Sequence, residues 1–139
     1  MIELIVGSRG SGKTKQMVDR INTSVKTTHG NIVCIEKSMK LTYELDHKCR
    51  LIDLDEYRIK GYDMLYGFVA GILAGNYDIV EVYIDGVLKV GSNGTPEKDL
   101  DGLGVLLGEL EVLAGDGIKI IVTVSADVEA LPESVKKYC

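Results

Sequence analysis

Apolar residues along the chain gather in short runs separated by longer segments of mixed polarity. Residues 2–6, IELIV, and residues 31–36, NIVCIE, are rich in branched aliphatic side chains and each adjoin a glycine. Similar runs occupy residues 49–54, 78–85 and 118–126. Continuous runs of this length are typical of strands buried on both faces. The pattern therefore predicts four or five strands.

The segments between these runs repeat their apolar residues at the spacing of a helix. From residue 13 to about residue 26, Met17, Ile21 and Val25 recur at intervals of four with polar residues between them. This predicts one helix with one apolar face. Residues 62–75 repeat apolar pairs at the same period and predict a second helix.

Two further helices are predicted toward the C-terminus. Thr95 and Pro96 match an N-cap followed by proline at the first helical position, and this helix extends to about residue 114, before Gly115. Residues 131–138 predict a short terminal helix. Strands that alternate with helices predict an α/β fold, doubly wound, with a mostly parallel sheet of four to five strands and helices on both faces.

Other segments carry weaker patterns. Residues 37–48 and the glycine-rich residues 89–98 are predicted to be loops. Gly67, Gly71 and Gly75 fall on one face of the second helix at intervals of four. This spacing favours close packing of that helix onto the sheet, and a self-association face is the alternative.

Length and composition indicate a single domain covering residues 1–139. The chain is 45% hydrophobic and 27% charged, which is the balance of a soluble globular protein with one core. No apolar stretch approaches the roughly 20 residues that span a bilayer, and no export signal precedes the first predicted strand. We therefore expect a cytoplasmic protein with no membrane partner.

The three cysteines fit this expectation. Cys34, Cys49 and Cys139 are an odd number in a chain without an export signal, so reduced thiols are favoured over a disulfide framework. His47 lies two residues before Cys49, but one such pair without a second is a weak zinc signal. We therefore predict no metal site at the thiols.

Charge is distributed unevenly along the chain. The net charge is −5, yet residues 1–30 carry five basic and two acidic side chains, whereas residues 97–116 carry one basic and six acidic. Proteins that grip a nucleic-acid backbone usually combine a basic stripe with a high pI, and the pI here is about 5.0. Nucleic acid is therefore disfavoured, and a small phosphorylated ligand bound near the N-terminus fits better.

The loop after the first strand explains this local positive charge. Residues 7–14 read GSRGSGKT and match the pattern G-x-x-x-x-G-K-T without deviation. Glycines in this pattern let the backbone curl so that successive N–H groups point at phosphate oxygens, and the following helix adds its partial positive end. Lys13 is predicted to bridge the β- and γ-phosphates, and the Thr14 hydroxyl is predicted to coordinate Mg²⁺.

A magnesium ion in such a site needs a carboxylate at the end of a neighbouring buried strand. Asp85 ends the run IVEVYID and is the favoured candidate. A turn-forming role is the alternative reading, since Gly86 follows it. Glu81 is the competing carboxylate, but it lies near the opposite end of the same predicted strand.

The chain resembles the P-loop nucleoside triphosphatases. GSRGSGKT is similar to their Walker A motif and IVEVYID to their Walker B strand. The number of strands predicted between the two motifs is similar to the RecA-type branch and to small stand-alone bacterial proteins described as ATPases. The resemblance implies a three-layer P-loop fold that binds ATP and Mg²⁺, with Thr123 or Ser125 as the polar residue that often ends the strand after Walker B.

The candidate site residues follow from these motifs. The nucleotide-binding candidates are Gly7, Ser8, Arg9, Gly10, Ser11, Gly12, Lys13, Thr14 and Lys15. The metal ligands are Thr14 and Asp85, and the catalytic candidates are Lys13, Thr14, Asp85 and Glu36.

The chain also departs from the family pattern. RecA-type ATPases commonly place a glutamate beside the Walker B aspartate, and Gly86 stands there instead. Glu36, at the end of the second predicted strand, is the nearest substitute for a base. No N-K-x-D guanine motif is present, and the four-cysteine zinc lobe of thymidine kinases is absent.

Three functions are consistent with these features. The favoured one is an ATP-binding P-loop protein with slow or partner-activated ATP hydrolysis, in which the partner is another protein or a second copy of the chain. The second is an interaction module in which nucleotide orders residues 89–98 without useful turnover. The third is a small-molecule, nucleoside-like kinase with its acceptor near Asp53, Asp55 and Tyr57.

Overall fold

A computed structural model describes residues 1–37, 44–92 and 98–139. Within these ranges the chain forms one parallel sheet in the order β1-β5-β4-β2-β3. The strands are β1 (Ile2–Gly7), β2 (Asn31–Glu36), β3 (Cys49–Asp53), β4 (Ile79–Asp85) and β5 (Lys119–Ser125). The α/β class, the parallel pairing and all five strands of the sequence prediction are confirmed.

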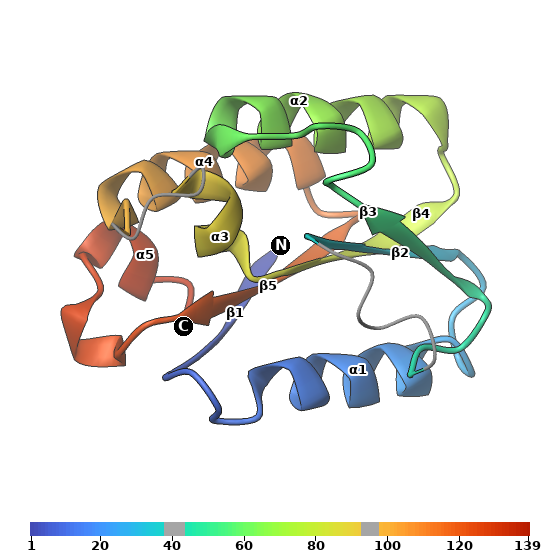
Figure 1. The fold of residues 1–139 in the computed structure, drawn as a ribbon. Helices are drawn as coiled ribbons and strands as arrows, with labels where there is room; N and C mark the ends of the chain where they lie inside the picture. The colour runs from blue at the N-terminus through green and yellow to red at the C-terminus, as the bar shows by residue number, and fades with distance from the viewer. Residues whose placement is uncertain (38–43, 93–97) are drawn as a thin grey trace.

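Helices cover both faces of this sheet and complete three layers (Figure 1). They are α1 (Lys13–Ser24), α2 (Gly61–Gly75), α3 (Val87–Gly91), α4 (Leu100–Ala114) and α5 (Glu133–Lys136), with a 3-10 turn at Val128–Ala130. Figure 1 shows α1 beneath the sheet, and α2, α3, α4 and α5 above it. None of the helices in the described ranges is long and apolar enough to cross a bilayer.

Two separate cores hold the layers together. The α1-side core consists of Ile5, Met17, Val18, Ile21, Val25, Ile32, Cys34, Cys49, Tyr83 and Ile121. The α2/α4-side core is larger and includes Val33, Ile35, Leu65, Val69, Leu73, Val82, Ile84, Leu103, Leu106, Leu107, Leu110, Ile120 and Val122. Because successive strand residues point to opposite faces, neighbouring positions such as Val33 and Cys34 supply different cores.

The start of α4 differs from the sequence prediction. The described helix begins at Leu100, and Asp99 is its N-cap, with a carboxylate oxygen that accepts the Gly102 N–H at 2.8 Å. The predicted start at Thr95 and Pro96 lies outside the described residues. An aspartate N-cap satisfies an otherwise unpaired N–H of the first turn, so it marks the beginning of the helix as well as threonine would.

Residues 89–98 are not entirely a loop, as predicted. Their first three residues belong to α3, which begins after Gly86. Val87, Leu88 and Val90 are buried against the α2/α4-side core, and this burial stabilises one helical turn that the glycines of the segment obscure. The terminal helix is also shorter than predicted, because α5 covers only Glu133–Lys136.

The glycines of α2 are not packed onto the sheet, so the favoured interpretation of their spacing was wrong. Gly67, Gly71 and Gly75 are exposed, and a Cβ added at each would meet no atom within 4 Å. The opposite face of the helix, with Leu65 and Val69, is buried instead. Self-association through the glycine face stays a prediction.

The topology brings the predicted site to one edge of the sheet. β5 is the single strand between β1 and β4. Parallel strands end at the same edge, and the register pairs Gly7 with Ser125, and Glu36 with both Asp85 and Asp53. Residues from five strands that are distant in sequence therefore meet where the loop after β1 begins.

Candidate nucleotide-binding site

The loop between β1 and α1 adopts a tight curl at this edge. Gly10 and Gly12 have φ values of 83° and 89°, a left-handed region that side chains disfavour and glycine adopts freely. The Ser11 N–H donates to the Ser8 carbonyl at 3.1 Å, and α1 begins immediately after Gly12. The first turn of α1 therefore presents its unpaired N–H groups, with their partial positive charge, to the inside of the curl.

Lys13 lies inside this loop rather than in solvent. Its side chain is buried, although it belongs to the first turn of α1. The Nζ atom donates to the Ser8 carbonyl at 2.9 Å. The ammonium group is therefore held on a neutral main-chain acceptor, and an anionic phosphate oxygen would form a stronger, charge-assisted hydrogen bond with it.

Thr14 and Asp85 come together although 71 residues separate them. The Thr14 hydroxyl lies 3.3 Å and 3.4 Å from the two carboxylate oxygens of Asp85. Hydroxyl and carboxylate oxygens are the hard donors that Mg²⁺ prefers. This donor pair fits the cation, and at sites of this type water and phosphate oxygens supply the remaining ligands.

Thr123 fixes the direction of the Asp85 carboxylate. Its side chain is buried on β5, and its hydroxyl donates to Asp85 Oδ1 at 2.6 Å while it accepts the Gly86 N–H at 2.7 Å. Thr123 is thus the residue of the Thr123 and Ser125 pair that contacts the carboxylate. These contacts tie Asp85 to the neighbouring strand, in a position that a turn-forming aspartate would not require.

A cavity of about 550 Å³ opens beside these groups. Its lining contains four basic side chains, Arg9, Lys13, Lys89 and Lys98, and two acidic ones, Asp85 and Asp127. The other lining residues are Ser8, Gly10, Thr14, Gly86, Leu88, Ser92, Thr123, Ser125 and Ala126. In a chain with a net charge of −5, this excess of cations at a loop of free N–H groups favours a polyanionic ligand.

Glu36 lies behind this cavity rather than in its lining. It ends β2 with only 3% of its surface exposed, and its Cα pairs in register with that of Asp85. Neighbouring strands lie about 4.8 Å apart, so one strand spacing separates the two backbones. The register places Glu36 on the side of Asp85 away from β5.

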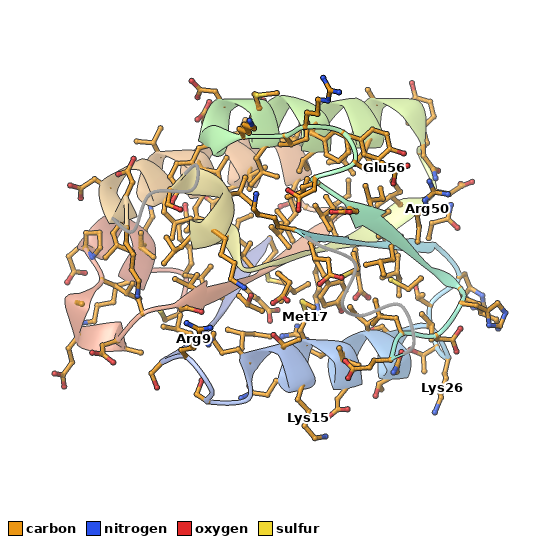
Figure 2. The ribbon with its side chains drawn as sticks, in the orientation of Figure 1. Arg9, Lys15, Met17, Lys26, Arg50 and Glu56 are labelled. Carbon is orange, nitrogen blue, oxygen red and sulfur yellow. The ribbon has the colours of Figure 1, made fainter. Side chains whose placement is uncertain are left out.

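Several predicted residues are not brought into the cavity. Lys15 is 80% exposed and its Nζ pairs with Asp19 at 3.1 Å, and Figure 2 shows its side chain pointing away from the sheet, whereas Met17 points toward it. Asp55 pairs with Lys37 at 3.0 Å, and the Tyr57 ring packs 5.5 Å from that of Phe68.

Residues that the sequence motifs did not indicate also line the cavity. Lys89 and Lys98 come from α3 and from the residue before the N-cap of α4. Asp127 follows β5. Their signal was position in the topology, because residues that follow β4 and β5 lie at the same edge as the loop after β1.

The cysteines are placed as inert thiols. Cys34 and Cys49 are buried in the α1-side core, whereas Cys139 is exposed. Burial is the main reason that the pKa of Cys34 is raised well above its usual range and that of Cys49 is raised to about 12. The described residues contain no group of three or more His, Cys, Asp or Glu side chains arranged to hold a metal ion, in agreement with the weak zinc signal at His47.

Comparison with solved structures shows which fold carries this site. A KaiC-like protein from the archaeon Pyrococcus horikoshii aligns with a TM-score of 0.69 at 14% identity, over 99% of this chain and 68% of that one. The flagellar accessory protein FlaH from Methanocaldococcus jannaschii gives 0.66 at 16% identity, over 98% and 65%. The conjugation coupling protein TcpA, in a monomer form with ATPγS, gives 0.55 at 18% identity, over 99% and 46%.

The fold is that of a P-loop ATPase domain. The position of β5 between β1 and β4 agrees with the RecA-type arrangement that the sequence resemblance implied. The chain spans about two thirds of the length of the first two structures and less than half of the third. No protein-family model matches the chain, and no curated protein matches it.

Proposed function

We propose that the protein binds ATP with Mg²⁺ and hydrolyses it slowly unless a partner supplies a missing group. The observation that carries this proposal is the approach of the Thr14 hydroxyl to both oxygens of Asp85 at 3.3 Å and 3.4 Å. Two motifs 71 residues apart meet beside the buried Lys13 amine in a cation-rich cavity. A chance glycine turn would not require this convergence.

Each group has a separate part in the proposal. The loop N–H groups and Lys13 bind the β- and γ-phosphates. Thr14 and Asp85 hold Mg²⁺, which when bound neutralises charge on those phosphates. Thr123 is a positioning residue, because it acts through Asp85. ATP is favoured over GTP because the guanine motif is absent, and TcpA, which shares the fold, was solved with ATPγS.

Glu36 is the proposed base. The oxygen of a water molecule attacks the γ-phosphorus, the bond to the bridging oxygen breaks, and ADP leaves with that electron pair. The water proton passes to the Glu36 carboxylate. Glu36 is buried one strand away from Asp85, so its access to water depends on small rearrangements. Turnover of the isolated protein should therefore be slow, below about one per minute, as in P-loop hydrolases without an added arginine.

Binding is tested by titration calorimetry with ATP and Mg²⁺. Wild-type protein should bind, Lys13→Ala should largely abolish binding, and Asp85→Asn should remove the Mg²⁺-dependent part while leaving Mg²⁺-free binding. Lys15→Ala is the matched control, since Lys15 lies in the next turn position but pairs with Asp19 outside the cavity. Equal affinities for wild type and Lys13→Ala would reject the site.

Turnover is tested by phosphate release from the same proteins. Glu36→Gln should lower the slow basal rate further while ATP affinity is retained. If wild-type protein alone hydrolysed ATP at several per second and Glu36→Gln left that rate unchanged, both the slow rate and the proposed base would be wrong.

A further inference from the structure

The cavity contains a second lysine that is held in the same way as Lys13. The Lys98 Nζ donates to the Ser125 carbonyl at 2.6 Å, just as the Lys13 Nζ donates to the Ser8 carbonyl at 2.9 Å. Both carbonyls are neutral acceptors at the carboxyl edge of the sheet. An ammonium group held only by a carbonyl remains available to an anion, which makes a stronger charge-assisted hydrogen bond.

The two carbonyls belong to neighbouring strand ends. The Cα atoms of Gly7 and Ser125 are register partners in β1 and β5, and the Ala126 N–H donates to the Gly7 carbonyl at 3.1 Å. Ser8 is the residue after Gly7. Lys13 and Lys98 therefore approach the start of the loop from its two sides, one from α1 and the other from the N-terminal side of α4.

We propose that Lys98 is a second phosphate-binding lysine, which contacts the β- and γ-phosphates of the nucleotide together with Lys13. This inference rests on the proposed function of the cavity. It supplies from within the chain a cation that many P-loop hydrolases take from outside as an arginine. Lys89, on α3, lines the same cavity, but its side-chain stem lies beside Gly86 rather than at the start of the loop.

A purely structural role for Lys98 is the competing explanation. In that case the ammonium group would only fasten the end of β5 through Ser125. Lys98→Gln would then lower the melting temperature of the protein without nucleotide, and any loss of affinity would be equal for ATP and ADP. A phosphate contact instead predicts little change in that melting temperature, because Lys98 is exposed and its bond to Ser125 is surface-accessible.

The test is calorimetric titration of Lys98→Gln, Lys98→Arg and wild type with ATP·Mg²⁺ and ADP·Mg²⁺. Lys26→Gln is the matched control, because it removes the same charge from the far end of α1 (Figure 2). Lys98→Gln should weaken ATP binding about ten- to a hundredfold, the range for a hydrogen bond to a charged group. The loss for ADP should be smaller, Lys98→Arg should recover most of the ATP affinity, and Lys26→Gln should bind as wild type.

Three results would overturn the inference. Lys98→Gln could bind ATP as tightly as wild type, it could lose ATP and ADP affinity by the same factor with a lower melting temperature, or Lys26→Gln could reproduce its loss. The first two would occur with wild-type binding intact and Lys13→Ala inactive, so the proposed function would stand. Absence of ATP binding by wild type would overturn both proposals together.

Discussion

The two faces of the sheet are built differently. The α2/α4-side core is covered by four helices and is almost entirely apolar, whereas the α1-side core lies under one helix (Figure 1). Polar groups also lie on the α1 face: Arg20 pairs with Glu3 at 2.6 Å, and the buried Tyr83 hydroxyl donates to the Glu81 carboxylate. Both helices that carry most of the apolar area, α2 and α4, therefore lie on the face away from the loop helix.

This difference separates stability from the candidate site. Buried apolar area is the dominant favourable term in folding, and most of it lies on the α2/α4 side. The loop, Lys13 and Thr14 are carried by α1, whose position depends on the smaller core. Changes in the larger core should therefore alter stability alone, and changes in the smaller core should alter stability and ligand affinity together.

The largest expected effect is on the α2/α4 side. Leu107 is fully buried in α4, so Leu107→Ala leaves a cavity and should cost about 3 to 5 kcal/mol of unfolding free energy. Urea unfolding followed by circular dichroism measures this loss. Val112→Ala on the same helix is the control, because Val112 is 83% exposed and its truncation should cost less than about 0.5 kcal/mol. Similar costs for the two variants would contradict the packing described here.

The next effect is on the α1 side. Met17 is fully buried one turn after Lys13. Met17→Ala should cost about 2 to 3 kcal/mol, because neighbours of a flexible side chain relax partly into the space. It should also weaken ATP·Mg²⁺ binding severalfold in the folded protein, as calorimetry would show. Leu107→Ala should leave that affinity unchanged, and equal effects of the two variants on affinity would remove the distinction between the cores.

A smaller effect concerns alkaline pH. Burial raises the pKa of Cys34 and Tyr83, and raises that of Cys49 to about 12. An unfolded thiol ionises near 9.0, so the neutral native thiols give their full contribution below that pH and lose it as pH rises. Each buried thiol should cost about 1 kcal/mol of unfolding free energy at about pH 10.

The measurement is urea unfolding at about pH 8 and about pH 10. Cys49→Ala should show a smaller decrease between the two pH values than wild type, whereas Cys139→Ala should show the same decrease, because Cys139 is exposed. A wild-type stability that does not fall over this range would show that the thiols ionise equally in both states.

The smallest effect is kinetic. An aromatic disulfide reagent should label Cys139 at once in the native protein, and Cys34 and Cys49 only when the α1 side opens. If α1 opens as a separate unit, these two thiols should react faster than global unfolding predicts. ATP·Mg²⁺ should slow their reaction and leave that of Cys139 unchanged. Labelling at the rate of global unfolding would show that the two cores open together.

The sequence predicted the strands and the motifs well because both are local signals. Lys13 and Thr14 follow a fixed spacing from Gly7, and Asp85 ends an apolar run. The pattern could predict the approach of Thr14 to Asp85 only through the family resemblance, since no local rule joins residues 71 apart. The order of the strands decides it.

Other features could not be read from local pattern. Lys98 is an ordinary charged residue beside a glycine-rich segment, and only the position of β5 brings it to the Ser125 carbonyl. The glycine face of α2 has the same spacing whether it is buried or exposed. Its outward direction follows from Leu65 and Val69, which compete for the sheet and bury more apolar area than glycine can.

Gly86 limits how this catalytic centre could be re-engineered. Its backbone has φ 68° and ψ 46°, a left-handed conformation that costs a side-chain-bearing residue about 1 to 2 kcal/mol. Introducing the glutamate that related ATPases carry beside the aspartate would therefore strain the turn that also supplies the Gly86 N–H to Thr123. A designer seeking a faster enzyme would do better to leave that turn intact and to improve water access at Glu36, where the strand already ends in a carboxylate.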